Sequence, residues 1–269
     1  MNRFQIALEL LQKIYPEKSS SNGTADLLKP LIEADGAAHY HFEKRIESYI
    51  DSIKPLPYFS VLLGTCRDGL PLLIDLANSD LSACLIQAPA KDARNDLLKL
   101  MLRSAVQLNP PEIIQYVIIT PHIRDYEFES GFPHCLDVLH PGQREAGELV
   151  MELSALIEQR NTGRQRGPAV IFVIEELERF INLMDEEILS NFKWILREGP
   201  GARVWPIATA NGPAWLSDKK VTSFFDTRIE SSEHLLAGVN HAEGGYASNA
   251  GHFQVSFSGE IYDFSLPAR

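Results

Sequence analysis

Cysteine is scarce in this chain, with three residues among 269. Cys66, Cys84 and Cys135 are widely separated and form no C-x-x-C pair, which argues against a disulfide framework and against a zinc site. The eight histidines add no group with metal-ligand spacing, so we expect no bound metal. Scarce, unpaired cysteines are typical of a reducing compartment, and we expect a cytoplasmic protein.

Long apolar runs and runs of basic residues are also missing. No stretch approaches the roughly 18 apolar residues of a membrane-spanning helix, and residues 1–15 are amphipathic rather than signal-peptide-like. The formal net charge is −11, and the densest basic stretch, Arg160–Arg166, holds three arginines. We therefore expect no direct membrane span and, at most, weak binding to DNA.

From Tyr58 onward, short apolar runs alternate with amphipathic stretches. The apolar runs are typical of strands buried on both faces of a sheet. They lie at Ala83–Gln87, Ile113–Thr120, Ala169–Ile174, Val204–Thr209 and Phe224–Ile229. Helical periodicity predicts helices at Arg94–Leu108, Arg144–Arg160 and Glu187–Arg197. This order predicts an α/β fold with a mostly parallel sheet flanked by helices.

The two ends of the chain follow other patterns. Residues 1–54 hold two amphipathic stretches, 1–15 and Ala38–Ile53, so we expect a short N-terminal helical appendage followed by a domain at 55–269. Near the other end, apolar residues alternate on both sides of Ser258-Gly259, which predicts a C-terminal β-hairpin. Gly238–Gly251 is rich in glycine, asparagine and serine and predicts a loop.

Five stretches together resemble the FtsK/SpoIIIE-type P-loop ATPases, the branch that contains DNA translocases and type VII secretion ATPases. They are LLGTCRDGLPLLIDLANSDLSACLIQA (Leu62–Ala88), YVIITPHIRDYEFESGFPHCLDVL (Tyr116–Leu139), LIEQRN (Leu156–Asn161), VIFVIEELERF (Val170–Phe180) and LREGPGARVWPIATANGP (Leu196–Pro213). Their order and spacing carry the resemblance. It implies a RecA-like P-loop NTPase core, a bacterial source, and a partner that is another ATPase subunit or a further protein.

The resemblance places a phosphate-binding loop at Ala88–Asn95. A working loop reads G-x-x-x-x-G-K-[ST]: its backbone amides cradle the phosphates, its lysine neutralises them and its hydroxyl binds Mg²⁺. Here Ala88 and Ala93 replace the glycines, Arg94 replaces the lysine and Asn95 replaces the hydroxyl residue. Alanine disfavours positive φ, and a forked guanidinium is a poor copy of a compact ammonium. We therefore expect a degenerate site that holds no cofactor.

Lys91 is the nearest alternative lysine, but its use would shorten the loop by three residues. In the segment that resembles the Walker B strand, Glu175 stands where an aspartate organises Mg²⁺, and Glu176 where a carboxylate polarises water. Two acids after a strand also have a simpler explanation, because acids are favoured in the first turn of a helix.

Two further family features are altered. Thr209 is retained from the family's Thr-Gln pair, whereas Ala210 replaces the glutamine that would sense the γ-phosphate. Gly199 occupies the place of the family's arginine, and Arg197 and Arg203 lie nearby. For both arginines we expect surface salt bridges rather than a role as an arginine finger.

Two hypotheses follow from these residues. The first is a degenerate FtsK/SpoIIIE-like protein with little or no ATP hydrolysis, acting as a structural or regulatory subunit or as a protein-binding module. The alternative is a weak ATP-dependent DNA or protein translocase that uses ATP, Mg²⁺, Glu176 and an atypical phosphate loop. An oligomer fits either hypothesis.

Overall fold

The computed structural model describes residues 47–53, 58–78, 82–164, 166–211, 221, 223–231, 251–257 and 259–266. They belong to one compact unit that spans Ile46–Ala268. Of the expected N-terminal appendage, only a helix at 47–52 falls within the described residues, so the appendage and its boundary stay predictions. The expected loop at Gly238–Gly251 also lies outside the described residues, except for Gly251.

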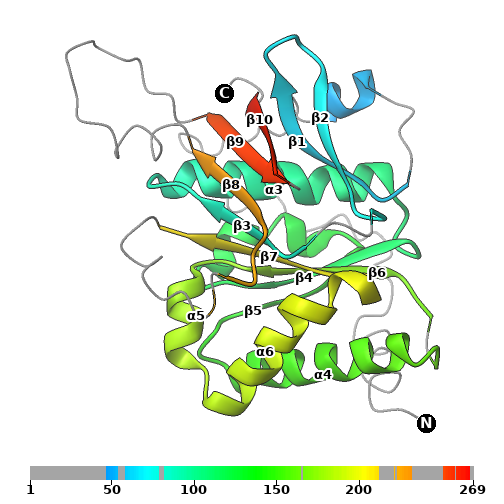
Figure 1. Ribbon diagram of the computed structural model, residues 1–269, viewed down its shortest axis with the longest axis vertical. Helices are drawn as coiled ribbons and strands as arrows, with labels where there is room; N and C mark the ends of the chain where they lie inside the picture. Colours follow the sequence, from blue (N-terminus) through cyan, green and yellow to red (C-terminus); the bar gives the residue numbers. More distant parts are fainter. Residues whose placement is uncertain are drawn as a thin grey trace, which may run out of the picture. The chain divides into compact units, whose positions relative to one another are not determined.

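The described strands form one ten-stranded sheet in the order β2-β1-β10-β9-β8-β3-β7-β6-β4-β5 (Figure 1). The strands are β1 (Ser60–Cys66), β2 (Pro71–Asp75), β3 (Cys84–Gln87), β4 (Ile114–Ile119), β5 (Cys135–Leu139), β6 (Ala169–Ile174), β7 (Val204–Ala210), β8 (Thr227–Ser231), β9 (His252–Phe257) and β10 (Glu260–Ser265). The helices are α3 (Lys91–Leu108), α4 (Arg144–Asn161), α5 (Leu177–Leu183) and α6 (Glu186–Glu198).

The six strands from β8 to β5 pair in parallel, and the four from β9 to β2 continue the sheet with antiparallel pairs. This confirms the predicted α/β architecture with a parallel core. Strand β6 shows why the continuous apolar runs were informative: all six residues of AVIFVI are buried, as expected for a strand covered by helices on both faces.

Helices cover the two faces of the parallel core separately (Figure 1). On one face, Ile118 and Val173 join a buried cluster with α3 residues such as Leu97. On the other face, the ring of Phe192 packs edge-on against those of Phe172 and Phe180, with centroids 6.4 Å and 5.1 Å away. Apolar burial on both faces fixes the sheet between its helices.

The C-terminal hairpin is confirmed. β9 and β10 pair over six residue pairs, and Gly259 in the turn has φ 82°, a conformation that glycine adopts without strain. The β1–β2 hairpin is attached differently. β1 pairs with β10 only at Thr65 and Cys66, and its earlier amide at Leu62 instead donates to Ser104 Oγ of α3 at 2.9 Å.

Four elements differ from the sequence prediction, one of which is α3, because it begins at Lys91 rather than at Arg94. β5 and α5 were not predicted: β5 lies at the sheet edge, where its residues are only partly buried, and α5 has seven residues, too few for a helical period to stand out. β8 begins at Thr227, three residues after the expected start at Phe224. The phenylalanines there suggested a strand, but Phe225 is buried from the preceding loop.

Candidate nucleotide-binding site

The predicted site residues converge at the carboxyl edge of the parallel strands. β3, β7, β6 and β4 are neighbours in the sheet. Ala88 follows β3, Thr209 lies near the end of β7, and Glu175 follows β6. In open α/β sheets this edge is where ligands bind. The structure thus brings the expected loop and the two glutamates to one place.

The loop itself is short, because α3 begins early. The helix starts at Lys91, three residues before the expected start at Arg94. Five of the eight positions of the expected loop, Lys91–Asn95, therefore lie in α3, and only Ala88–Ala90 connects it to β3. No residue in this segment has a positive φ. Alanines favour helix over an open loop, and Asp92 suits the first helical turn.

Arg94 folds back onto the loop that precedes it. Its side chain is 2% exposed, and Nη1 donates hydrogen bonds to the carbonyl oxygens of Ala88 and Pro89, the latter at 3.3 Å. The loop thus turns carbonyl oxygens toward a cation held within the chain. A phosphate-binding loop has the opposite polarity, because its amide hydrogens face an anion.

The charges around Arg94 fit this arrangement. Burial lowers the pKa of the guanidinium, and the carboxylates of Glu175, Glu178 and Glu176 act in the opposite direction. The cation therefore sits among acids of its own chain. A phosphate group entering the same space would meet both these carboxylates and the two loop carbonyls, and like charges repel.

The other loop residues have structural contacts. Lys91 Nζ lies 2.9 Å from Asp125 Oδ2, and both side chains are more than a third exposed. Ala93 is buried in the core. Asn95 is 9% exposed, and its Oδ1 has no hydrogen-bond partner among the described residues. Asn95 therefore points inward without contributing a hydroxyl for a metal.

Glu175 is a buried carboxylate. Its side chain is 1% exposed, and Oε2 accepts a hydrogen bond from Thr120 Oγ1. Burial raises the pKa of Glu175, although the Thr120 hydrogen bond and the charges of His122 and Lys91 partly oppose the shift. Oε1 has no partner within the described part of the chain. A carboxyl group in this setting favours its neutral form more than an exposed one does.

Glu176 adopts an unusual backbone conformation, with φ 56° and ψ 66°, directly before α5. Its N–H donates to Thr209 Oγ1 at 3.1 Å, and its Oε1 lies 3.1 Å from His122 Nε2. Glu176 is the N-cap residue of α5, so a helix does begin directly after the two glutamates, as the simpler explanation of the acid pair expects. Left-handed non-glycine residues cost energy and cluster at functional positions.

No side chain fits where the family has its arginine. A Cβ on Gly199 would lie 2.7 Å from the carbonyl oxygen of Val204 and closer still to that of Ile195. The nearby arginines have surface contacts: Arg197 Nε lies 2.8 Å from Glu198 Oε1, whereas the Arg203 guanidinium lies over the ring of Phe59 at 4.7 Å. The predicted salt bridge is thus found at Arg197, and Arg203 stacks on a ring.

Sequence reasoning gave no role to three groups that the fold brings to this edge. His122 contacts Glu176, Thr120 contacts Glu175, and Tyr126 is fully buried, with its pKa raised well above the usual value, mainly by burial. All three come from Tyr116–Leu139, one of the stretches that carry the resemblance. Their place in that stretch was the available signal.

Comparison with known proteins depends on structure rather than on sequence. No protein-family profile matches the sequence, and no curated protein is significantly similar to it. ATPases 2 and 3 of Thermomonospora curvata EccC, solved with a signal sequence peptide, superpose on 79% of this chain with a TM-score of 0.61 and 12% identity. The pCW3 conjugation coupling protein TcpA, solved with ATPγS, gives 0.62 and 13% over 80% of this chain. The chain has the fold of the FtsK/SpoIIIE-type P-loop ATPases.

The cytoplasmic domain of EssC shares the FtsK/SpoIIIE-type fold as well, with a TM-score of 0.60 and 14% identity over 82% of this chain. This chain covers 41% of the EccC structure, 46% of the EssC structure and 67% of TcpA. It therefore spans less than half of the EccC and EssC structures that it matches. The fold confirms the predicted RecA-like core.

Two observations concern the described residues only. No helix among them is both long and apolar enough to cross a membrane. Nor do their histidine, cysteine, aspartate and glutamate side chains form a group of three or more that would hold a metal ion. The three cysteines are free thiols.

Proposed function

We propose that this chain is a non-hydrolysing member of the FtsK/SpoIIIE-type fold that acts beside active ATPase subunits as a structural or regulatory subunit. The observation that carries the proposal is Arg94, whose guanidinium is hydrogen-bonded to the loop carbonyls of Ala88 and Pro89. The position that would grip a phosphate is filled by a side chain of the same chain.

The local polarity supports this reading. For a phosphate to bind, Arg94 would have to release two carbonyl oxygens, which would then face the anion. Three residues, Ala88–Ala90, connect β3 to α3, so few amides are available to turn toward a phosphate, and Pro89 has none. Reorganisation would require α3 to unwind at its first turn, where Ala93, Arg94 and Asn95 are all buried.

The magnesium position is equally unsuited. A divalent ion prefers charged or hydroxyl oxygens and needs deprotonated ligands. Asn95 offers one neutral oxygen, and burial raises the pKa of Glu175. The Thr120 hydroxyl, which donates to Glu175, already occupies one of its oxygens. The residues present therefore do not fit a nucleotide with its metal.

The partner class follows from the extent of the match. The EccC structure contains ATPases 2 and 3, and this chain covers 41% of it, about the share of one of its two ATPases. We propose that the chain supplies one such module to an assembly whose other subunits hydrolyse ATP. The net charge of −11 favours a protein partner over DNA, and we place the assembly on the cytoplasmic side.

A turnover measurement tests the proposal against the translocase alternative. Purified full-length chain, assayed for phosphate release with Mg-ATP, should show no turnover above that of the Glu176→Gln variant. Glu176 is the control because it stands where the family has its water-polarising carboxylate, and its side chain is 20% exposed. Turnover that Glu176→Gln abolishes would establish the weak motor and overturn the proposal.

A second arm tests the partner. The tagged chain should co-purify from its native cell with an ATPase, and adding the purified chain to that ATPase should change its turnover or assembly. A partner whose turnover and assembly are indifferent to the chain would contradict a structural or regulatory role.

A further inference from the structure

Strand β2 forms one edge of the described sheet. β1 pairs with it on one side, and no described strand pairs with it on the other. Its sequence, Pro-Leu-Leu-Ile-Asp, is apolar except for its last residue, and the first four residues are only partly buried. An exposed apolar edge strand is a template for pairing with another strand.

The backbone N–H and C=O groups of successive β2 residues point alternately toward β1 and toward the outer edge of the sheet. Cys66 N–H donates to Leu70 O at 2.8 Å, and Leu76 N–H donates to Phe59 O at 2.9 Å. These bonds, with the register of the hairpin, direct the backbone of Leu72 and Ile74 toward β1. The backbone groups of Pro71, Leu73 and Asp75 therefore face outward.

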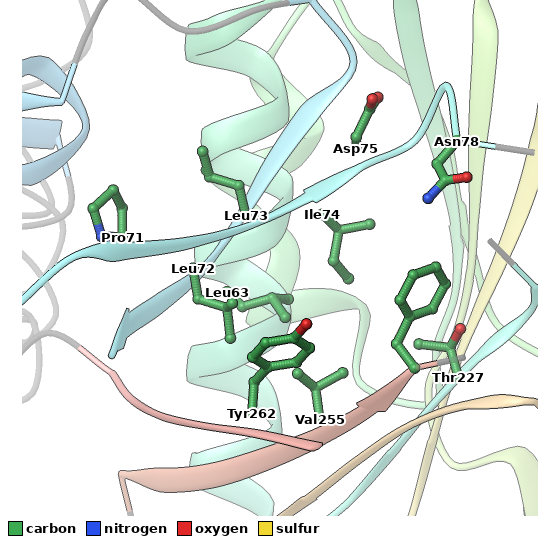
Figure 2. Close-up of a pocket in the computed structure, with 11 residues that line it drawn as sticks. Leu63, Pro71, Leu72, Leu73, Ile74, Asp75, Asn78, Thr227, Val255 and Tyr262 are labelled. Atoms are coloured by element: carbon green, nitrogen blue, oxygen red, sulfur yellow. The ribbon is translucent and has the colours of Figure 1, made fainter. Parts of the chain in front are cut away.

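A cavity of about 480 Å³ runs beside this strand (Figure 2). Leu72 and Ile74 point into it from β2, and Val255 and Tyr262 point into it from the C-terminal hairpin. All five residues of β2 line it, so the cavity borders the whole length of the strand. An apolar side chain brought to this edge from outside would find apolar surface.

We propose that the outer edge of β2 pairs antiparallel with β2 of a second copy of this chain, about a two-fold axis at Leu73. Such an interface is isologous: each copy presents the same strand. In this register Leu73 faces Leu73 of the second copy, and Pro71 faces Asp75 of the second copy. The sheets of the two copies become one.

The hydrogen-bonding groups of the strand are complementary to themselves in this register. The two Leu73 residues exchange both N–H···O=C bonds, and each Asp75 N–H meets the carbonyl of the opposite Pro71. Pro71 has no N–H to donate to the Asp75 carbonyl that lies opposite it. That carbonyl already accepts a hydrogen bond from Asn78 N–H of its own copy at 3.1 Å. Each outward donor thus meets a carbonyl that accepts from no described residue, and the missing donor faces an occupied carbonyl.

The side chains also match. Directly opposite residues of an antiparallel pair lie on the same face, so Leu72 meets Ile74 of the second copy on the cavity side, twice across the axis. Leu73 meets its counterpart on the other side. The apolar pattern of β2 is nearly palindromic about Leu73, which is what self-pairing requires. Because the contact is one short strand, we expect reversible dimerisation with a dissociation constant on the order of 100 µM.

Cysteine cross-linking tests the register. Directly opposite hydrogen-bonded residues have Cα atoms about 5.5 Å apart, within the range of about 4.4–6.8 Å for a disulfide. Full-length Leu73→Cys should therefore form a covalent dimer under oxidised glutathione. Asp75→Cys is the matched control, because the two 75 positions would be about 14 Å apart. Equal cross-linking of both variants, or none of Leu73→Cys beyond the wild type, would overturn the proposal.

Sedimentation and hydrogen exchange test the pairing without a cross-link. The wild type should shift from monomer toward dimer between about 10 and 500 µM. Leu73→Lys should abolish the shift, whereas Ile261→Lys, at an apolar strand residue that is 67% exposed, should preserve it. The Leu73 and Asp75 amides should gain protection with concentration, while those of Leu72 and Ile74 stay protected throughout. A chain that remains monomeric, or exchange at Leu73 that ignores concentration, refutes self-pairing.

Discussion

Replacing Arg94 with alanine should destabilise the protein even without any nucleotide. The guanidinium satisfies the carbonyl oxygens of Ala88 and Pro89 and lies among carboxylates that partly oppose the lowering of its pKa by burial. Each buried polar group left without a partner costs about 1–3 kcal/mol. With water admitted into part of the space, we expect Arg94→Ala to lower the free energy of unfolding by about 2–4 kcal/mol.

For a chain of this size, that loss corresponds to a fall in Tm of about 5–15 °C. Thermal and urea unfolding, followed by circular dichroism, measure it. Arg94→Lys keeps the charge, but its side chain ends one atom short of Nη1, the atom that donates to both carbonyls, so its loss should be about half as large. Arg144→Ala is the matched control, because that side chain is 83% exposed, and its effect should stay within about 0.5 kcal/mol.

The reasoning fails if Arg94→Ala is as stable as Arg144→Ala. In that case the guanidinium would contribute nothing to the stability of the fold, as expected for the lysine of an empty phosphate loop. The same melts in Mg-ATP give a second check. A ligand that binds only the folded state raises Tm, so a clear rise for the wild type would contradict a filled site.

Three further predictions concern the buried carboxyl of Glu175, the Arg103–Glu129 ion pair and the packing of β1 against β10. Burial raises the pKa of Glu175 above its ordinary 4.5, so the folded state binds that proton more tightly, and this group's stabilisation is lost as pH rises through the folded-state pKa. Relative to the wild type, Glu175→Gln should therefore be more stable at pH 7 than at pH 5 in urea melts. A difference in free energy of unfolding between variant and wild type that is the same at both pH values would contradict the raised pKa. Glu129→Ala should lower the free energy of unfolding by about 3–5 kcal/mol, because it removes the carboxylate 2.9 Å from Arg103, whose side chain is 4% exposed. A loss below about 1 kcal/mol in the same melts would contradict this prediction. Gly64→Ala should lower the free energy of unfolding by about 1–3 kcal/mol, because its Cβ would lie 2.8 Å from the Phe264 ring. Gly131→Ala is the control, because a Cβ there meets open space; equal melting temperatures of the two variants would refute the close packing of β1 and β10.

The parallel core and the C-terminal hairpin were predictable because their signals are local. AVIFVI at β6 is apolar throughout and buried throughout, and a Ser-Gly turn between alternating strands specifies a hairpin. The site was predictable only in part. The spacing of Ala88, Arg94 and Asn95 predicted an altered phosphate loop, but not the early start of α3 at Lys91.

The contacts within the site lie beyond sequence reasoning for a physical reason. Arg94 reaches back six and five residues to the carbonyls of Ala88 and Pro89, and that geometry depends on where α3 begins. Glu176 has a left-handed backbone conformation, and its N–H donates to Thr209, 33 residues away. Such long-range contacts override local propensity, so the loop chemistry was predictable and its shape was not.

The central claim is that Arg94 closes the phosphate site. A calorimetric titration of full-length wild type with ATP and Mg²⁺ tests it most directly. The account predicts no saturable heat for the wild type up to millimolar nucleotide. An Arg94→Lys, Asn95→Thr variant, which restores the family's residue types at these two positions, is titrated in parallel. A micromolar dissociation constant for the wild type would contradict it.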